Sequence, residues 1–175
     1  MNYATIKWTD IANGEGVRVS LFVSGCTHRC KNCFNEVAWD FSYGEPFGEA
    51  VQKKIIDALA SEYIAGLSLL GGEPLEPQNQ EALYPFVKRV REIYPRKTIW
   101  CYTGFIFDEQ SETLQEKYKN TPYTKELLSM FDVLVDGPYV EECKDIRLKF
   151  RGSSNQRVID LQKTLRQKEI VLYLE

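Results

Sequence analysis

The sequence lacks long apolar runs and clusters of basic residues. None of its 175 residues belongs to a stretch that approaches the roughly 18 consecutive apolar residues of a membrane span, and residues 1–7 show no apolar signal core. The formal net charge of −3, without a run of basic residues, gives no reason to expect nucleic-acid binding. We therefore expect a cytoplasmic protein that binds neither membranes nor nucleic acids.

Internal repeats, low-complexity segments and linkers are also absent. The length fits one domain on a prior of roughly 150 residues per domain, and 43% apolar and 27% charged residues are ordinary for a globular protein. A chain of this size buries a core without disulfides, so we expect a single domain over residues 1–175. The five cysteines are an odd number, which in a reducing compartment indicates metal or redox chemistry.

Short apolar runs alternate with helical patterns along the chain. Runs rich in β-branched, aromatic or leucine residues predict strands at 17–23, 66–70, 98–103, 131–136 and 169–174, and a short one at 3–8. Apolar spacing predicts helices within 51–63, 83–94, 109–130 (split at Pro122) and from the caps at 153–155 through Leu165. Strands alternating with helices predict an α/β fold with a mostly parallel sheet.

Four successive predicted strands end in glycine beside a polar or thiol group. Ligands bind at the carboxyl ends of the strands in parallel α/β folds, on the loops that follow. We therefore expect one edge of the sheet to gather Cys26, Glu73, Thr103 and Asp136.

Cys26, Cys30 and Cys33 lie within eight residues of one another. Three thiolates at this spacing supply three ligands, whereas a ferredoxin-type [4Fe-4S] cluster takes four cysteines. One iron would remain without a protein ligand and could bind a substrate, as the open position of a catalytic zinc does. The alternative is a structural zinc with His28, Cys101 or Cys143 as fourth ligand, but the sequence has no second cysteine pair of the kind such sites use.

The run Cys26-Thr27-His28-Arg29-Cys30-Lys31-Asn32-Cys33 resembles the signature of radical S-adenosylmethionine (radical SAM) enzymes. With the following Phe34-Asn35, it is most similar to the activating proteins of anaerobic ribonucleoside-triphosphate reductases. The resemblance implies an incomplete α/β barrel of mostly parallel strands with outer helices, a [4Fe-4S] cluster, and S-adenosyl-L-methionine bound to the iron that lacks a cysteine. It further implies reductive cleavage of S-adenosylmethionine and abstraction of a hydrogen from a glycine of the large reductase subunit, with a one-electron donor such as flavodoxin.

Gly71-Gly72-Glu73-Pro74 matches a second radical SAM motif, which contacts the methionine amino group of the cofactor. Two glycines and a proline would also make a tight turn after a strand without any ligand. Absence of side chains would let backbone carbonyls reach a cationic amino group. Glu73 is expected to fix the turn or to add negative potential.

The resemblance also implies other contacts of the cofactor with the chain. Many radical SAM proteins carry an aromatic residue just before the third cysteine, but this chain has Asn32 there and Phe34 after Cys33. Adenine is therefore expected to meet the backbone of Asn32 and Phe34, on either side of Cys33. Asp136 is a candidate acceptor of hydrogen bonds from ribose hydroxyls or from the incoming peptide, and Arg151, beside the predicted helix start, suits the cofactor carboxylate.

Two questions stay open at this point. His28, the only histidine, matches a histidine in the reductase activators but is equally well explained as a solvated loop residue. The function itself has alternatives, namely an activator of another glycyl-radical enzyme such as pyruvate formate-lyase, a radical SAM enzyme with a small-molecule substrate, or a non-catalytic zinc-stabilised interaction domain.

Overall fold

The computed structural model describes residues 1–107 and 123–174. One eight-stranded sheet runs through the molecule in the order β3-β1-β2-β4-β5-β6-β7-β8. Its strands are β1 (Asn2–Asp10), β2 (Val17–Val23), β3 (Glu45–Pro46), β4 (Ile64–Gly71), β5 (Thr98–Tyr102), β6 (Val133–Asp136), β7 (Arg157–Asp160) and β8 (Leu172–Leu174). The helices of the described part are α1 (Glu49–Leu59), α2 (Pro77–Ile93), α4 (Thr124–Met130) and α5 (Leu161–Gln167), with short 3-10 turns η1 (Glu36–Trp39) and η2 (Glu141–Cys143).

The centre of the sheet is parallel and both of its sides are antiparallel. β2, β4, β5 and β6 pair in parallel, whereas β1 with β2, β1 with β3, β6 with β7, and β7 with β8 pair antiparallel. The α/β class is therefore confirmed, but the expected partial barrel of mostly parallel strands is not shown, because most strand pairs of this mixed sheet are antiparallel. The error lies at the two sides of the sheet, because the apolar runs predict strands but do not report their direction.

Residues 153–165 depart most from the prediction. The chain does not start a helix at Ser153; residues 157–160 form β7 beside β6, and α5 begins only at Leu161. Apolar residues of the strand and of the helix happen to continue one helical spacing, so periodicity alone could not separate them. The predicted helical region at 109–130 lies largely outside the described residues, and its end corresponds to α4.

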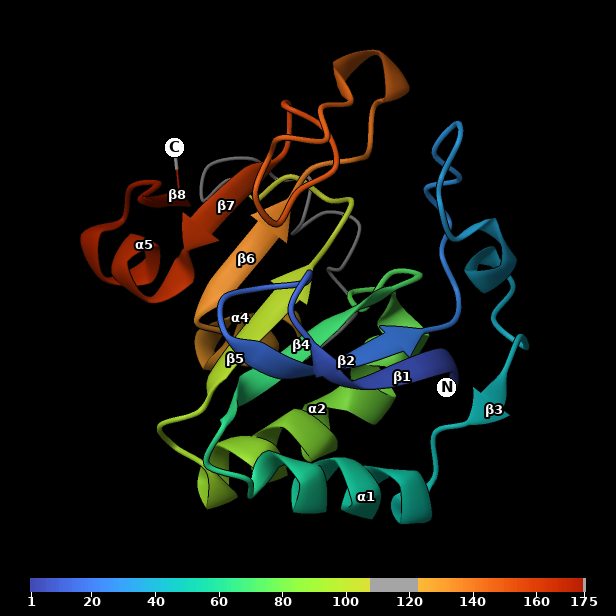
Figure 1. The fold of residues 1–175 in the computed structure, drawn as a ribbon, viewed down its shortest axis with the longest axis vertical. Helices are drawn as coiled ribbons and strands as arrows, with labels where there is room; N and C mark the ends of the chain where they lie inside the picture. The colour runs from blue at the N-terminus through green and yellow to red at the C-terminus, as the bar shows by residue number, and fades with distance from the viewer. Residues whose placement is uncertain (108–122, 175) are drawn as a thin grey trace.

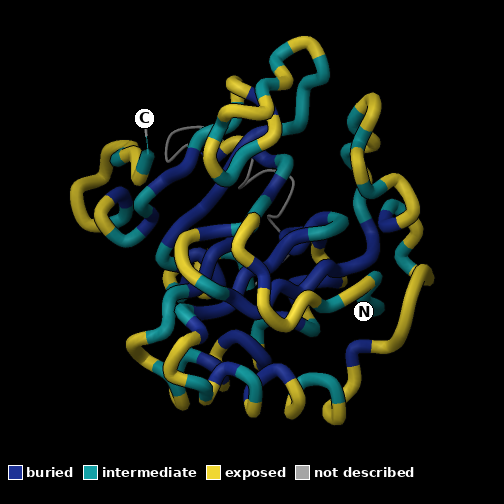
Figure 2. The backbone as a smooth tube through the Cα atoms, in the orientation of Figure 1, coloured by how far each residue is buried: buried dark blue, intermediate teal, exposed yellow. Residues whose placement is uncertain are grey.

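The main core lies between the sheet and its helices. Strand residues such as Leu21 and Leu69 are fully buried and pack with residues of α1 and α2 such as Leu59 and Phe86. Figure 1 shows α1 and α2 together on one face of the sheet, and Figure 2 shows the central strands as the buried interior of the chain. Within residues 1–107 and 123–174, no helix is long and apolar enough to cross a membrane.

The opposite face of the sheet buries a charge, Arg18 on β2. Its side chain is fully buried and donates five hydrogen bonds to neutral oxygens, among them the Ser68 hydroxyl at 2.7 Å and the Thr98 carbonyl at 2.8 Å. The guanidinium also lies 5.5 Å from the ring centroid of Trp100. Burial lowers the pKa of Arg18 to about 10, so it remains a cation at neutral pH. The loop at 11–16 packs over this face, where the Ser68 hydroxyl donates to the Asn13 carbonyl at 2.5 Å.

Asp160 ends β7 and caps α5, since its carboxylate accepts a hydrogen bond from the Lys163 amide at 2.9 Å. Burial opposes its ionisation, but the hydrogen bonds from Lys163, together with the charges of Lys163 and Arg166, lower the pKa of Asp160. A depressed folded-state pKa stabilises the fold above the unfolded-state value, and this contribution is lost as pH falls through the folded value. Asp160→Ala should cost about 1 kcal/mol of unfolding free energy at pH 7, measured by urea denaturation.

Asp160→Asn is the matched variant, because asparagine caps helices as well as aspartate does. It should keep most of the stability at pH 7 and remove the Asp160 contribution to acid sensitivity. Equal stability of the alanine variant and the wild type at pH 7 would contradict the capping role.

Candidate functional site

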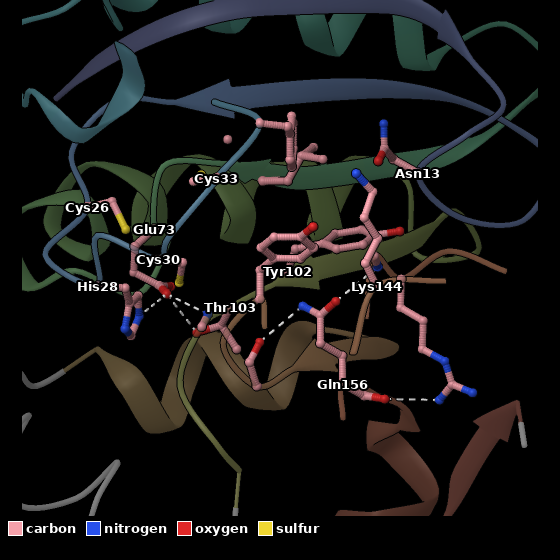
Figure 3. Close-up of a pocket in the computed structure, with 18 of the residues that line it drawn as sticks. Asn13, Cys26, His28, Cys30, Cys33, Glu73, Tyr102, Thr103, Lys144 and Gln156 are labelled. Carbon is pink, nitrogen blue, oxygen red and sulfur yellow. Dashed lines mark hydrogen bonds and ion pairs between the residues drawn. The ribbon is translucent and has the colours of Figure 1, made fainter. Parts of the chain in front are cut away.

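The carboxyl ends of the parallel strands surround one cavity of about 470 Å³. Loops from both halves of the chain line it, as Figure 3 shows. Ligand pockets for small molecules and cofactors have volumes of roughly 300–1,000 Å³. The residues predicted from the sequence that line this cavity are Cys26, Cys30, Asn32, Cys33, Phe34, Gly71, Gly72, Glu73, Thr103 and Arg151.

The cysteine loop, residues 24–35, follows β2 directly. Gly25 donates its amide to the Ala38 carbonyl at 2.7 Å, and Cys26 donates to the Trp39 carbonyl at 3.2 Å. Within the loop, Arg29 and Asn32 adopt left-handed backbone conformations (φ 50° and 58°). This path brings three thiols from a short segment to one cavity.

The thiols of the cysteine loop are unpaired. All five cysteines of the chain are free; Cys101 is buried in the main core and Cys143 lies half-buried outside the cavity lining. Burial raises the pKa of Cys26 to about 11, and the charges of Glu73 and Glu76 add to the increase. Burial raises the pKa of Cys30 as well. Binding a metal centre must therefore release protons from these thiols.

The donor set fits an iron–sulfur cluster. Among the residues that the structure describes, no three His, Cys, Asp or Glu side chains are close enough to hold a single metal ion. A [4Fe-4S] cluster makes a different demand, because each cysteine binds a separate iron. The three free thiols of this loop are the ligand type that such clusters use.

The Gly-Gly turn after β4 lies against the start of the cysteine loop. Gly72 donates to the Val23 carbonyl at 2.7 Å and Glu73 donates to the Gly25 carbonyl at 2.8 Å. A Cβ on Gly72 would lie 2.5 Å from the Gly25 carbonyl oxygen and 2.9 Å from that of Ala38. The absence of a side chain at Gly72 is therefore required by the approach of two backbone segments, apart from any ligand.

Replacing Gly72 by alanine should lower the unfolding free energy by about 1–3 kcal/mol, because the added methyl overpacks against fixed backbone. Gly48→Ala is the matched control, since a Cβ there meets nothing within 4 Å. Urea denaturation of the cluster-free protein measures both. If the two variants unfold at the same urea concentration, the steric argument fails.

Two buried carboxylates connect the cysteine loop to β4 and α2. Glu73, expected to fix the turn, accepts hydrogen bonds from His28 Nε2 at 2.8 Å and from the Thr103 hydroxyl at 3.0 Å (Figure 3). Glu76 accepts from the amide of Thr27 at 2.9 Å and from its hydroxyl at 2.5 Å. Glu76 was not predicted from the sequence; its one signal was a carboxylate just before Pro77, where α2 begins.

His28 is not a solvated loop residue. Its side chain is 14% exposed and pairs with Glu73. Its ring also packs edge-on against Phe105, with 4.3 Å between ring centroids.

Asp136 and Pro74 do not line the cavity. The Asp136 carboxylate is buried and accepts bonds from the Phe107 amide at 2.7 Å and from Arg157 Nε at 2.9 Å. Arg151 lines the cavity and donates to the Gln156 carbonyl at 3.0 Å. The helix start that the sequence placed beside Arg151 is wrong, as α5 begins ten residues later at Leu161.

Tyr102, at the end of β5, was not predicted as a site residue. It lines the cavity, and its hydroxyl is buried without a hydrogen-bond partner within the described ranges. Burial raises its pKa well above the usual value. A molecule bound in the cavity could supply the missing partner.

Comparison with known proteins defines the class of this site. A sequence model of the 4Fe-4S single cluster domain matches residues 12–159. The chain is 44% identical over 158 residues to the anaerobic ribonucleoside-triphosphate reductase-activating protein of Haemophilus influenzae, covering 89% of this chain and 96% of that protein. It is 40% identical over 164 residues to the protein of that name from Escherichia coli K12 (93% and 100% covered), and 38% over 158 residues to that of Enterobacteria phage T4 (90% and 93%). The chain therefore belongs to the family of the anaerobic ribonucleoside-triphosphate reductase-activating proteins, whose 4Fe-4S single-cluster domain it carries.

Proposed function

We propose that this protein is a radical SAM enzyme that activates an anaerobic ribonucleoside-triphosphate reductase by generating a glycyl radical in its large subunit. One observation carries the proposal: three free thiols and the Gly-Gly-Glu turn line the same cavity, at the carboxyl ends of the parallel strands. The family membership of the chain supports the anaerobic reductase as its partner. The proposal places a [4Fe-4S] cluster and S-adenosyl-L-methionine together in this cavity.

When bound, the cluster and S-adenosylmethionine would supply the radical chemistry, reductive cleavage of the cofactor, that removes a hydrogen from the glycine. Cys26, Cys30 and Cys33 would each bind one iron. The backbone at Gly71 and Gly72 would accept hydrogen bonds from the methionine amino group.

Other cavity residues would seat the remainder of the cofactor. Asn32 and Phe34 would meet adenine, as expected from their position beside Cys33. Arg151 would attract the cofactor carboxylate. Tyr102 would donate its unpartnered hydroxyl to the bound molecule. Asp136 would act indirectly, because its pair with Arg157 holds β7 against β6.

The remaining parts of the proposal concern the setting of the reaction. The electron would come from a one-electron donor such as flavodoxin, in the cytoplasm. The cavity lies among surface loops, and exposed apolar side chains such as Phe34 and Ile146 stand among its lining residues. This arrangement suits a substrate that is a segment of another protein better than a small molecule enclosed by extra elements.

The decisive experiment combines the anaerobically reconstituted protein with the large reductase subunit of the same organism, dithionite and S-adenosylmethionine. An electron paramagnetic resonance (EPR) signal of a glycyl radical should appear, and it should require all components. Release of 5′-deoxyadenosine without a radical on this reductase would direct the search to another glycyl-radical enzyme. Retention of zinc, with neither cluster nor product, would leave only a binding domain.

A further inference from the structure

The buried carboxylate of Glu73 joins three segments at the carboxyl edge of the sheet. Its Oε2 atom accepts from His28 Nε2 at 2.8 Å, from the Thr103 hydroxyl at 3.0 Å and from the Gly104 amide at 2.8 Å. Its Oε1 atom accepts from the Leu75 amide at 2.9 Å. The cysteine loop, the turn after β4 and the loop after β5 therefore meet at one fully buried side chain.

His28 provides the contact from the cysteine loop. It lies between Cys26 and Cys30, and both its nitrogen and its ring are constrained. Nε2 is engaged with Glu73, and the ring lies against Phe105. On the Gly104 side there is no spare room, because a Cβ built on Gly104 would lie 2.6 Å from Cδ2 of His28.

We infer that His28 is a positioning residue, which holds the Cys26–Cys30 segment at the sheet edge through Glu73 and so sets where two of the thiolates meet the cluster. The inference rests on the proposed function, since it concerns the cluster that this function requires. His28 is not a cluster ligand in this arrangement: its Nε2 donates to a carboxylate, and that bond fixes the ring. Residues that orient metal ligands in this way typically account for about 10–100-fold in metal affinity.

The same geometry gives a reason for the residue type. The donor must reach a carboxylate buried beneath the turn, and it must present a flat face to Phe105. The contribution of His28 to the fold without a cluster should be small, because Glu73 keeps its bonds from Thr103, Gly104 and Leu75 when His28 is replaced. A positioning role and a structural role therefore predict different results for the cluster-free protein.

The test compares His28→Leu with His28→Gln after anaerobic reconstitution. Leucine removes the donor, whereas glutamine can present an N–H group at a similar reach. His28→Leu should lower the affinity for the cluster, measured as retained iron and sulfide, by about 10–100-fold, and should shift the EPR spectrum and midpoint potential of the reduced cluster. His28→Gln should recover most of both properties, and the cluster-free variants should melt close to the wild type.

Two further variants sharpen the result. Gly104→Ala leaves His28 in place but displaces its ring, and should reproduce the spectral shift of His28→Leu. Lys31→Ala is the matched control in the same loop, because its side chain is 77% exposed and its 3.7 Å approach to Glu142 is a surface contact. It should change neither iron content nor spectrum.

Two results would overturn the inference by itself. The first is that the wild-type protein binds a cluster and the His28→Leu variant binds it with unchanged iron content, EPR spectrum and midpoint potential. The second is that the cluster-free His28→Leu variant loses thermal stability to the same degree as the variant loses cluster affinity, because the role of His28 would then be structural. A wild-type protein that binds no cluster would instead overturn the proposed function, and this inference with it.

Discussion

Cys30→Ala should abolish release of 5′-deoxyadenosine from S-adenosylmethionine by the reconstituted, dithionite-reduced protein. Cys30 lines the cavity with the other two thiols of its loop, and loss of a direct ligand should exceed the roughly 10–100-fold effect of losing an outer-shell partner. The iron and sulfide content of the variant should fall in parallel. Chromatographic assay of 5′-deoxyadenosine under anaerobic conditions measures the effect.

Cys143→Ala is the matched control for this experiment. Cys143 is also a free, half-buried cysteine, but it lies in η2 and does not line the cavity. It should retain iron and turnover close to the wild type. Full turnover by Cys30→Ala, or equal losses in both variants, would show that the three thiols of the loop do not form the centre of the reaction.

Arg18→Leu should lower the unfolding free energy by about 3 kcal/mol. The substitution removes five hydrogen bonds, each with a net contribution of about 1 kcal/mol, and leaves buried acceptors unsatisfied. It also leaves a cavity beside Trp100. Relief of the desolvation that lowers the pKa of Arg18 offsets part of this loss. Urea denaturation of the cluster-free protein gives the value without contributions from metal.

Lys53→Ala is the control, because it removes a positive charge that is exposed on the surface. Lys53 pairs with Asp57 on the surface of α1, with both side chains more than half exposed, and such a pair contributes roughly 0.3–0.5 kcal/mol. If Arg18→Leu lowers the unfolding free energy no more than Lys53→Ala does, the hydrogen bonds of Arg18 only offset the free energy of burying its charge.

The sequence predicted the centre of the fold better than its margins. The four parallel strands were predictable because each is a short, mostly apolar run that ends at a glycine or is followed by one within two residues. On the antiparallel sides, the strands predicted at 3–8 and 169–174 correspond to β1 and β8, but β7 was missed, since it has four residues and continues directly into α5. The direction of these strands could not be predicted, because apolar periodicity does not report it.

For the candidate site, the cysteine spacing and the Gly-Gly-Glu turn identified residues that the structure places around one cavity. The partners of buried carboxylates could not be predicted. Glu73 bonds His28 over 45 positions, and Asp136 bonds Arg157 over 21. Such pairs depend on how the strand ends come together in three dimensions. A local sequence pattern does not contain this information.

The contacts of Arg18 also bear on the order in which the chain folds. The β1–β2 hairpin pairs Asp10 with Arg18 over a short separation, so it can form while the rest of the chain is still being synthesised. The acceptors at Ser68 and Thr98 lie 50 and 80 positions further on, and contacts of such separation form late. Until they exist, the early hairpin presents a hydrated cation on the face that will become interior, which opposes its pairing with other unfinished chains.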